Sequence, residues 1–190
     1  MYDHNCKLCP LSLTVPQHEW ICVEGSGDFN SRGMILGEAP GQNESAKGIP
    51  FIGRAGEILD IALLIAGLQR KDIFVTNTIK CRPPENRKPE IFEETACRIY
   101  LKREFEAVDP IAVLALGNHA LRASTGLWGI SKYVGVWQSV PRRSLENLLV
   151  LPCWHPAYIL RQPGLLNDFQ IYVQDFASFL AQKKQVLQEQ

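Results

Sequence analysis

The sequence has no long hydrophobic run, and none approaches the roughly 18 consecutive apolar residues typical of a membrane-spanning helix. Its first residues, Met1-Tyr2-Asp3-His4, lack the basic and then apolar pattern of a secretory signal. Internal repeats and low-complexity segments are absent too. We therefore expect a cytoplasmic protein that has no membrane partner.

The chain also lacks net charge, because its 20 Lys and Arg residues balance its 20 Asp and Glu residues. Total charge therefore neither indicates nor excludes a nucleic-acid partner, which would need a local basic patch. The hydrophobic fraction of 46% and the charged fraction of 21% are those of an ordinary globular protein. A length of 190 residues suits one domain, residues 1–190, with a single core.

Short apolar runs alternate with segments of helical periodicity. Four runs are apolar on both faces, as buried parallel strands are: 33–36, 73–79, 111–116 and 148–151. The segments of helical pattern are 55–66, 89–108, 119–124 and 168–187. This alternation predicts an α/β fold, a three-layer α/β/α domain whose central four-stranded parallel sheet has helices on both faces.

Two loops far apart in the chain carry candidate functional residues. Gly37-Glu38-Ala39-Pro40-Gly41 follows the first predicted strand, and Gly48-Ile49-Pro50-Phe51-Ile52-Gly53 comes soon after it. Trp154-His155-Pro156-Ala157-Tyr158 follows the last predicted strand. Open α/β sheets bind ligands at the carboxyl ends of their strands, so a carboxylate, an exposed Phe and a His are expected to meet there. Such a trio suits polarising a flat heterocycle and stacking on it.

Six cysteines are present. Cys6-Lys7-Leu8-Cys9 is a close pair that can hold one metal centre, Cys81 follows the second predicted strand, and Cys97 lies 16 positions later. Four thiolates suit either an iron–sulfur cluster or a tetrahedral zinc ion. Four unrelated thiols are the alternative, because the second pair is too widely spaced to be diagnostic. Cys22 and Cys153 lie near apolar residues and are expected to be buried packing thiols.

These motifs resemble those of the family-4, iron–sulfur uracil-DNA glycosylases. The run GEAPGQNESAKGIPFIGRAG, from Gly37 to Gly56, is similar to their first motif. Asn77-x-x-Lys80-Cys81-Arg82-Pro83-Pro84-x-Asn86-Arg87 resembles their signature, and Leu116-Gly117 and His155-Pro156-Ala157 fit the later landmarks. The resemblance runs from about Cys6 to Arg161. It implies a uracil-DNA glycosylase-like fold and removal of uracil from DNA in base excision repair.

The sequence also departs from that family. Val134-Gly135 occupies the place of a frequent Arg-Gly pair, and Cys153-Trp154 stands where Thr and an aromatic residue are common. Segment 127–140 is also particular to this protein. These differences bear on the choice of substrate more than on the reaction.

The resemblance implies a monofunctional hydrolase that flips a base out of DNA and cuts its N-glycosidic bond. Phe51 would stack on the base, and the Asn77 amide would accept from uracil N3–H and donate to O4. His155 would donate to O2, where negative charge grows as the base leaves. Glu38 would position a water or stabilise the cationic sugar, because Ala39 stands where better-known relatives carry Asp.

Further residues of the expected site contact the base edge or the phosphates. Gly37 and Ala39 belong to the base-binding set, and Glu44 is expected near the C5 edge, where it would help to exclude thymine. Backbone amides around Gly41, Gly53 and Ala55 are expected to form an anion-binding nest. The candidate DNA-contacting cations are Arg54, Lys80, Arg82, Arg87 and Arg161. Each of these taken alone is more often a solvated surface charge.

For the cysteines, the resemblance implies a structural [4Fe–4S] cluster on Cys6, Cys9, Cys81 and Cys97, with zinc as the alternative. The N-terminal segment would then be a cluster-binding segment of the domain. The expected partner is DNA, single- or double-stranded, that contains the target base, and we expect a monomer.

Two other functions remain open at this point. One is a glycosylase of the same fold that removes a modified base, such as a modified cytosine of phage DNA in antiviral defence. Segment 127–140 and Cys153-Trp154 motivate it. The other is a non-catalytic DNA-binding protein, which the presence of Glu38, Asn77 and His155 argues against.

Overall fold

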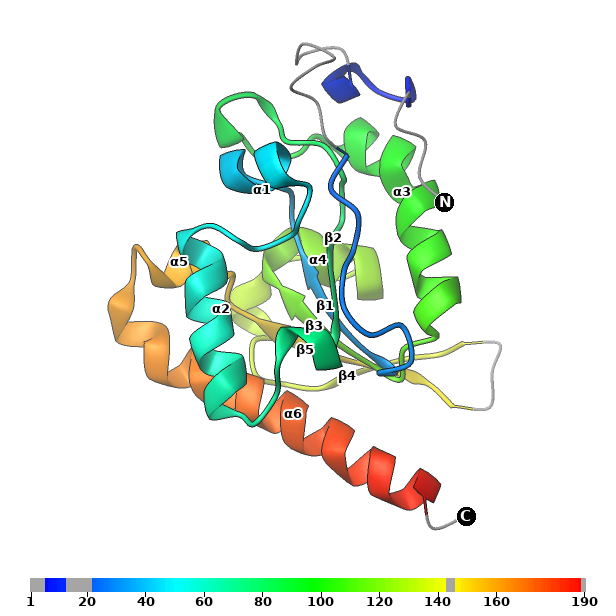
Figure 1. Cartoon of the computed structure of the whole chain (residues 1–190), viewed down its shortest axis with the longest axis vertical. Coiled ribbons are helices and arrows are strands. Elements are labelled where there is room, and N and C mark those ends of the chain that lie inside the picture. Colours follow the sequence, from blue (N-terminus) through cyan, green and yellow to red (C-terminus); the bar gives the residue numbers. More distant parts are fainter. Residues whose placement is uncertain (1–5, 13–21, 143–145, 189–190) are drawn as a thin grey trace.

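The computed structural model describes residues 6–12, 22–142 and 146–188 of the chain. Residues 1–5 and 13–21, parts of the predicted cluster-binding segment, lie outside this range. A five-stranded sheet forms the middle of the fold, with the strand order β2-β1-β3-β5-β4 (Figure 1). The parallel strands are β1 (Gly33–Gly37), β2 (Phe74–Asn77), β3 (Ala112–Leu116) and β5 (Leu148–Cys153).

The fifth strand is a difference from the predicted four-stranded sheet. β4 (Gln138–Val140) pairs antiparallel with β5 at the edge of the sheet. Its residues are exposed or half-buried. A short edge strand of this kind has no apolar run, so the pattern that predicts buried strands does not detect it. The three-layer α/β/α architecture itself is confirmed.

Four helices match the predicted segments within a few residues: α2 (Arg54–Ile65), α3 (Ile91–Val108), α4 (Gly117–Thr125) and α6 (Leu166–Gln188). Two short helices were not predicted, α1 (Gln42–Lys47) and α5 (Pro156–Ile159). Helices this short complete too few turns to show an apolar stripe. No helix in the described ranges is long and apolar enough to cross a membrane.

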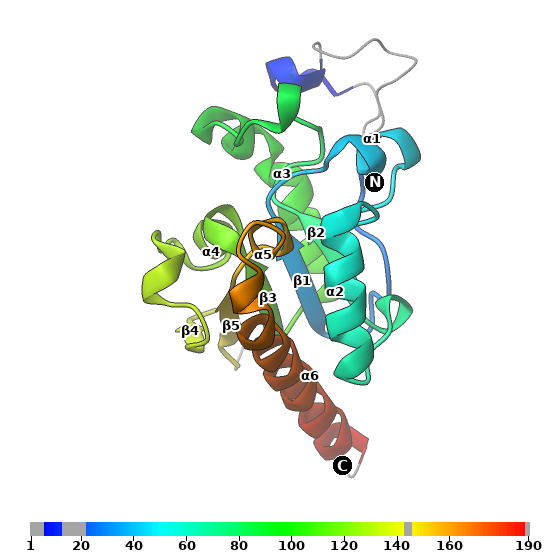
Figure 2. The same cartoon turned by 90° about the vertical axis from the view of Figure 1, so that its left-hand side faces the viewer.

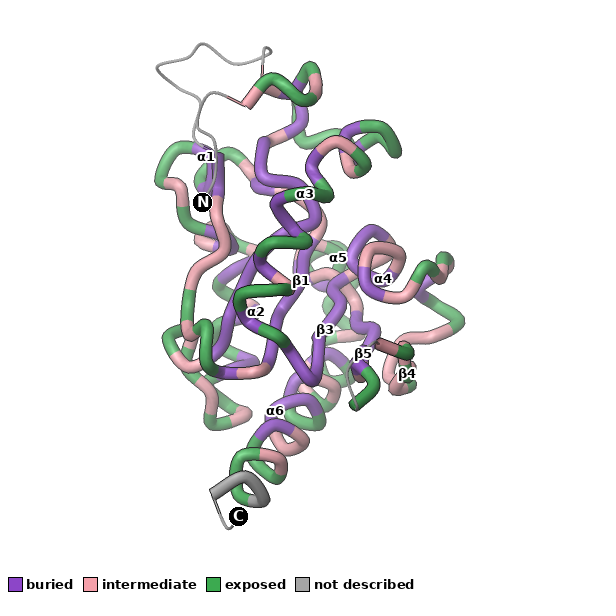
Figure 3. Tube along the Cα trace, turned by 90° about the vertical axis from the view of Figure 1, so that its right-hand side faces the viewer, coloured by how far each residue is buried: buried purple, intermediate pink, exposed green. Residues whose placement is uncertain are grey.

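The helices cover the two faces of the sheet (Figure 2). Side chains of α2 and α6, including Leu59 and Phe176, pack in one core cluster with Ile35 of β1. Those of α3 and α4, including Leu101, pack in a second cluster with Met34 on the other face. Neighbouring residues of β1 thus enter opposite layers, which explains why the strand is apolar throughout and buried along its length (Figure 3).

The sheet register brings the predicted loops to one edge. Gly37 at the end of β1 pairs with Asn77 at the end of β2, and Leu116 at the end of β3 pairs with Cys153 at the end of β5. Parallel strands end at the same edge, so the segments that follow all four strands gather there.

Just beyond β2, the structure corrects the predicted role of Lys80 as a DNA-contacting cation. The Lys80 side chain is 0% exposed. Its Nζ donates to Thr76 Oγ1 at 2.6 Å, to the backbone oxygen of Asn77 at 2.7 Å and to Glu104 Oε2 at 2.6 Å. Lys80 therefore ties the end of β2 to α3 from inside the protein and cannot reach a phosphate.

We predict that Lys80→Ala lowers the free energy of unfolding by about 3–5 kcal/mol, because buried Glu104 then loses the opposite charge beside it. The matched control is Lys102→Ala, since Lys102 is exposed on α3 and stands 3.6 Å from Glu106. Exposed pairs of this kind contribute little, so the control should unfold close to the wild type. Urea unfolding measures both, and equal stabilities of the two variants would contradict the role assigned to Lys80.

Candidate functional site

A pocket of about 420 Å³ opens at the edge where the parallel strands end. The structure brings into its lining most of the residues predicted to act on the base or the DNA: Glu38, Ala39, Gly41, Glu44, Phe51, Asn77, Arg87, His155 and Arg161. They come from the loop after β1, from α1, from the loop between α1 and α2, from the end of β2 and its exit loop, and from the segment that follows β5. The predicted meeting of distant loops therefore occurs around one cavity.

Asn77 presents a buried amide to this pocket. The residue is 2% exposed, and its Oδ1 has no hydrogen-bond partner within the part of the chain that the structure describes. Buried polar atoms are nearly always paired, so an exception at a pocket indicates an atom that a ligand satisfies. A side chain at Gly37 would place a Cβ 2.4 Å from this oxygen and 2.3 Å from Phe51 Cζ. Only glycine at position 37 lets the amide and the ring lie so close together.

Phe51 forms a wall of the pocket, but it is buried rather than exposed as predicted, with 5% of its surface accessible. Its ring stacks on that of His155, with the centroids 5.8 Å apart and the planes at 29°. The backbone of Phe51 has a φ of 55°, in the left-handed region that bulky residues avoid. Arg70 holds this conformation, because its guanidinium donates to the backbone oxygens of Pro50, at 2.7 Å, and of Phe51.

His155 is positioned as a neutral donor. Its Nδ1 accepts the backbone N–H of Ala157 at 3.1 Å, which leaves Nε2 to carry the ring proton. Burial, and secondarily the positive charge of Arg161, lowers the pKa of His155 to about 4. The ring is therefore uncharged near neutral pH and can donate a hydrogen bond from Nε2.

Glu38 is the carboxylate of the pocket, and 28% of its side chain is exposed. Burial raises its pKa, while the nearby positive charges of His119 and Lys88 act against that rise. Glu38 Oε2 lies 3.7 Å from His119 Nε2. Sequence motifs alone identify Glu38 as a candidate site residue, but they do not identify His119.

Glu44 fastens the two glycine-rich loops to each other. Its carboxylate accepts the backbone N–H groups of Gly41 at 3.1 Å, Ile52 at 2.9 Å and Gly53 at 2.8 Å. The expected anion nest is therefore wrong at Gly41 and Gly53, because these amides already bind a carboxylate of the protein itself. The predicted contact of Glu44 with the C5 edge of a base remains a prediction.

The remaining predicted cations lie at different places. Arg87 and Arg161 line the pocket, as does Lys88, which the motifs did not single out. The Arg87 guanidinium is held by the Glu93 carboxylate through contacts of 2.6 and 2.9 Å.

Two other arginines stand outside the pocket lining. Arg82 donates to Asn86 Oδ1 at 2.8 Å in the loop after β2. Arg54 is exposed at the start of α2. Their contacts with DNA remain predictions.

The four predicted metal ligands share one packed cluster, in which Cys81 and Cys97 are buried and Cys6 and Cys9 are half-buried. Ala39, in the loop after β1, packs against the same cluster. Four thiols are a donor set that suits iron–sulfur or zinc binding. Within the described ranges, however, no three His, Cys, Asp or Glu side chains are arranged so that they would hold a metal ion.

The two other cysteines are buried, as predicted. Cys153 lies in the core cluster of the α2 and α6 face. Cys22 is nearer to the predicted ligands than its sequence position indicates, because its thiol forms a hydrogen bond with Cys81 that raises the pKa of Cys22.

Three residues that position the site have no sequence signal. Arg70, Lys88 and His119 lie in polar or helical stretches that match no motif. Their contacts reach across the chain, as from Arg70 to Phe51 and from His119 to Glu38. Such contacts can be identified only from the three-dimensional structure.

Comparison with known proteins shows to which family the chain belongs. A model of the uracil DNA glycosylase superfamily matches residues 24–177. A type-4 uracil-DNA glycosylase of Pyrobaculum aerophilum is 37% identical over 179 residues, which cover 92% of this chain and 88% of that one. The corresponding enzyme of Sulfurisphaera tokodaii is 38% identical over 170 residues, covering 85% and 74%. That of Thermotoga maritima is 36% identical over 157 residues, covering 83% and 79%. The chain therefore belongs to the uracil DNA glycosylase superfamily, within its type-4 family.

Proposed function

We propose that this protein is a monofunctional uracil-DNA glycosylase of base excision repair. The observation that carries the proposal is the buried, unpartnered Oδ1 of Asn77, which faces the same pocket as the neutral ring of His155. Uracil offers one N–H between two carbonyl oxygens. An amide and a separate donor on one pocket wall match that edge.

In the proposed complex the base is flipped out of the DNA and lies against the Phe51 ring. Asn77 Oδ1 accepts the N3–H of uracil, and the Asn77 NH₂ donates to O4. Thymine differs from uracil only at C5. Glu44 lies in the pocket lining with its carboxylate fixed by three amides, so it cannot swing away from a C5 methyl group that approaches it.

The bond between C1′ and N1 breaks with its electron pair passing to the base. Negative charge then grows on O2, and His155 Nε2–H donates to it, a contribution of about 3 kcal/mol for one well-placed donor. A neutral ring is suited to this task because it retains its proton near neutral pH. Glu38 faces the cationic sugar and orients the water whose oxygen bonds to C1′, and the water's proton is released to that carboxylate.

Phosphate contacts come from the cations at the rim of the pocket. Arg87, Lys88 and Arg161 line it, and Arg54 and Arg82 extend the basic surface in the proposal. Residues 1–190 act as one domain and as a monomer, with the cysteine-bearing N-terminal segment ahead of the matched region 24–177.

We also propose a [4Fe–4S] cluster on Cys6, Cys9, Cys81 and Cys97. The packing of these four residues in one cluster supports it, as does the resemblance to the iron–sulfur glycosylases. The group would have a structural role, joining the N-terminal segment to the loop after β2. That loop carries Arg82 and Arg87 toward DNA.

The direct test is single-turnover base release from oligonucleotides that contain uracil, thymine or a 5-modified cytosine, in single- and double-stranded form. The protein is expressed in a host that lacks its own uracil-DNA glycosylase. We expect release of uracil, no release of thymine, and an abasic site on an intact backbone. If the protein released modified cytosine but not uracil, the assigned substrate would change from uracil to a modified cytosine. A protein–DNA adduct trapped by borohydride would refute the monofunctional reaction.

Asn77→Ala should slow uracil release by about 5–150-fold, because two hydrogen bonds worth about 0.5–1.5 kcal/mol each are lost. Affinity for DNA should change little, since phosphate contacts supply most of it. Asn147→Ala is the matched control, because its exposed amide bonds Ser139 away from the pocket. Excision at the wild-type rate by Asn77→Ala would show that the amide does not read the base.

Anaerobically purified protein should contain about four iron atoms per chain and absorb visible light as iron–sulfur proteins do. Cys81→Ser should lose most of this iron. Cys153→Ala should retain it, because that thiol is buried in a different core cluster from the four predicted ligands. One equivalent of zinc and no iron in the wild type would instead favour a tetrahedral zinc site.

A further inference from the structure

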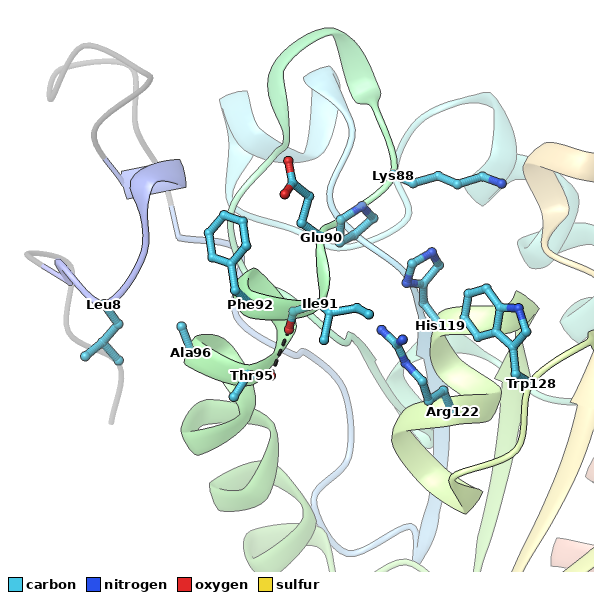
Figure 4. A pocket seen from close by; sticks show the side chains of 11 residues that line it. Leu8, Lys88, Glu90, Ile91, Phe92, Thr95, Ala96, His119, Arg122 and Trp128 are labelled. Carbon is cyan, nitrogen blue, oxygen red and sulfur yellow. Dashed lines mark hydrogen bonds between the residues drawn. The ribbon is translucent and has the colours of Figure 1, made fainter.

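A chain of charged side chains extends from Glu38 away from the catalytic pocket. It runs through His119 of α4, Glu94 of α3 and Arg122 of α4. A second pocket, of about 1050 Å³, opens on the outer side of this chain and is lined by His119, Arg122 and Trp128 (Figure 4). His119 thus stands between the two pockets, with Glu38 on its inner side.

The two ring nitrogens of His119 both face carboxylates. Nε2 lies 3.7 Å from Glu38 Oε2, and Nδ1 contacts Glu94 Oε1. A carboxylate only accepts hydrogen bonds, so Nδ1 carries a proton where it contacts Glu94, while Nε2 faces Glu38 at a distance too long for a hydrogen bond. The ring therefore stands between two carboxylates, and its side chain is only 6% exposed.

The outer partners fix the ring in place. Glu94 Oε2 accepts from the Arg122 guanidinium at 2.5 Å. That guanidinium lies 5.0 Å from the centre of the Trp128 ring, and Trp128 meets His119 edge-on with the centroids 5.4 Å apart. Every member of the group therefore contacts at least two others, which leaves the imidazole little freedom to turn away from Glu38.

We propose that His119 is a positioning residue that acts through Glu38, keeping this carboxylate ionised and directed into the catalytic pocket. Glu94 and Arg122 hold His119 for that purpose. The inference rests on the proposed glycosylase reaction, in which only the ionised carboxylate can orient water and stabilise a cationic sugar.

The charges around Glu38 fix the direction of the effect. Four charged groups act on it: His119 from α4, Lys88 from the loop before α3, Glu94 from α3 and Arg161 after α5. Burial raises the pKa of Glu38, and Glu94 adds to the rise, while the three positive charges oppose it. Loss of the His119 charge removes the first of these opposing charges. The pKa of Glu38 then rises further. As the pH falls, base release is therefore lost at a higher pH than in the wild type.

The first measurement needs no substrate. The carboxyl group of Glu38 is titrated by NMR in glutamate-labelled protein, with its signal assigned by its absence in Glu38→Gln. In His119→Gln we expect the midpoint to rise by about 1 pH unit, as for loss of one opposite charge at this range. His119→Lys keeps a charge and should stay near the wild-type midpoint. Trp128→Phe, which changes packing but no charge, should not shift it either.

The second measurement is the pH profile of single-turnover uracil release. The acid limb of His119→Gln should move upward with the Glu38 midpoint, while the rate at high pH is largely restored. In a Glu38→Gln background, adding His119→Gln should cause no further loss. An additional loss as large as that seen in the wild-type background would mean that His119 does not act through Glu38.

The outcomes separate this inference from the proposed function. An unchanged Glu38 midpoint in His119→Gln, or a raised one in His119→Lys, overturns the role of His119 whatever the substrate is. If His119→Gln does not fold, the Glu38 midpoint in His119→Lys still tests the role of His119, because a raised midpoint in that variant overturns it. Failure of the wild type to release uracil refutes the substrate assignment and leaves the titration result intact.

Discussion

The buried amine of Lys80 is the contact on which the rest of the site depends. It donates to a side chain of β2, to the backbone oxygen of Asn77 and to Glu104 of α3. One fully buried charge therefore fixes the end of the strand that presents the pocket amide, and it does so from directly beside Cys81 in the sequence. Removing either partner of such a pair leaves a charge in the interior, so β2 and α3 are held together rigidly.

Around that fixed strand end, the loops that form the pocket are held by charged side chains that bond to the backbone. The Glu44 carboxylate binds amides of both glycine-rich loops, and Arg70 binds the carbonyls of Pro50 and Phe51. Bonds between a charged group and the backbone are stronger than those between neutral groups. The loops thus gain the fixed geometry that a catalytic pocket needs without being part of the sheet.

The buried architecture was predictable from the sequence because each parallel strand is apolar on both faces, as in 111–116 and 33–36. The two loops with Glu38 and His155 were also predictable, since each follows such a run. β4 was not, because an exposed edge strand has no apolar pattern. The role of Lys80 was predicted wrongly for a different reason, because its partner Glu104 lies 24 residues further on and nothing in the local sequence reveals the contact.

Phe51 keeps a left-handed backbone that disfavours any bulky residue by about 1–2 kcal/mol relative to the right-handed form. Glycine would adopt the same conformation without strain, but it would remove the ring that stacks on His155. Phe51 also belongs to the core cluster of the α2 and α6 face, and truncating a buried Phe costs about 3–5 kcal/mol, more than the strain that glycine would relieve. Directed evolution for heat resistance would therefore keep an aromatic residue at position 51 despite its strained backbone, because one ring belongs both to the core and to the pocket wall.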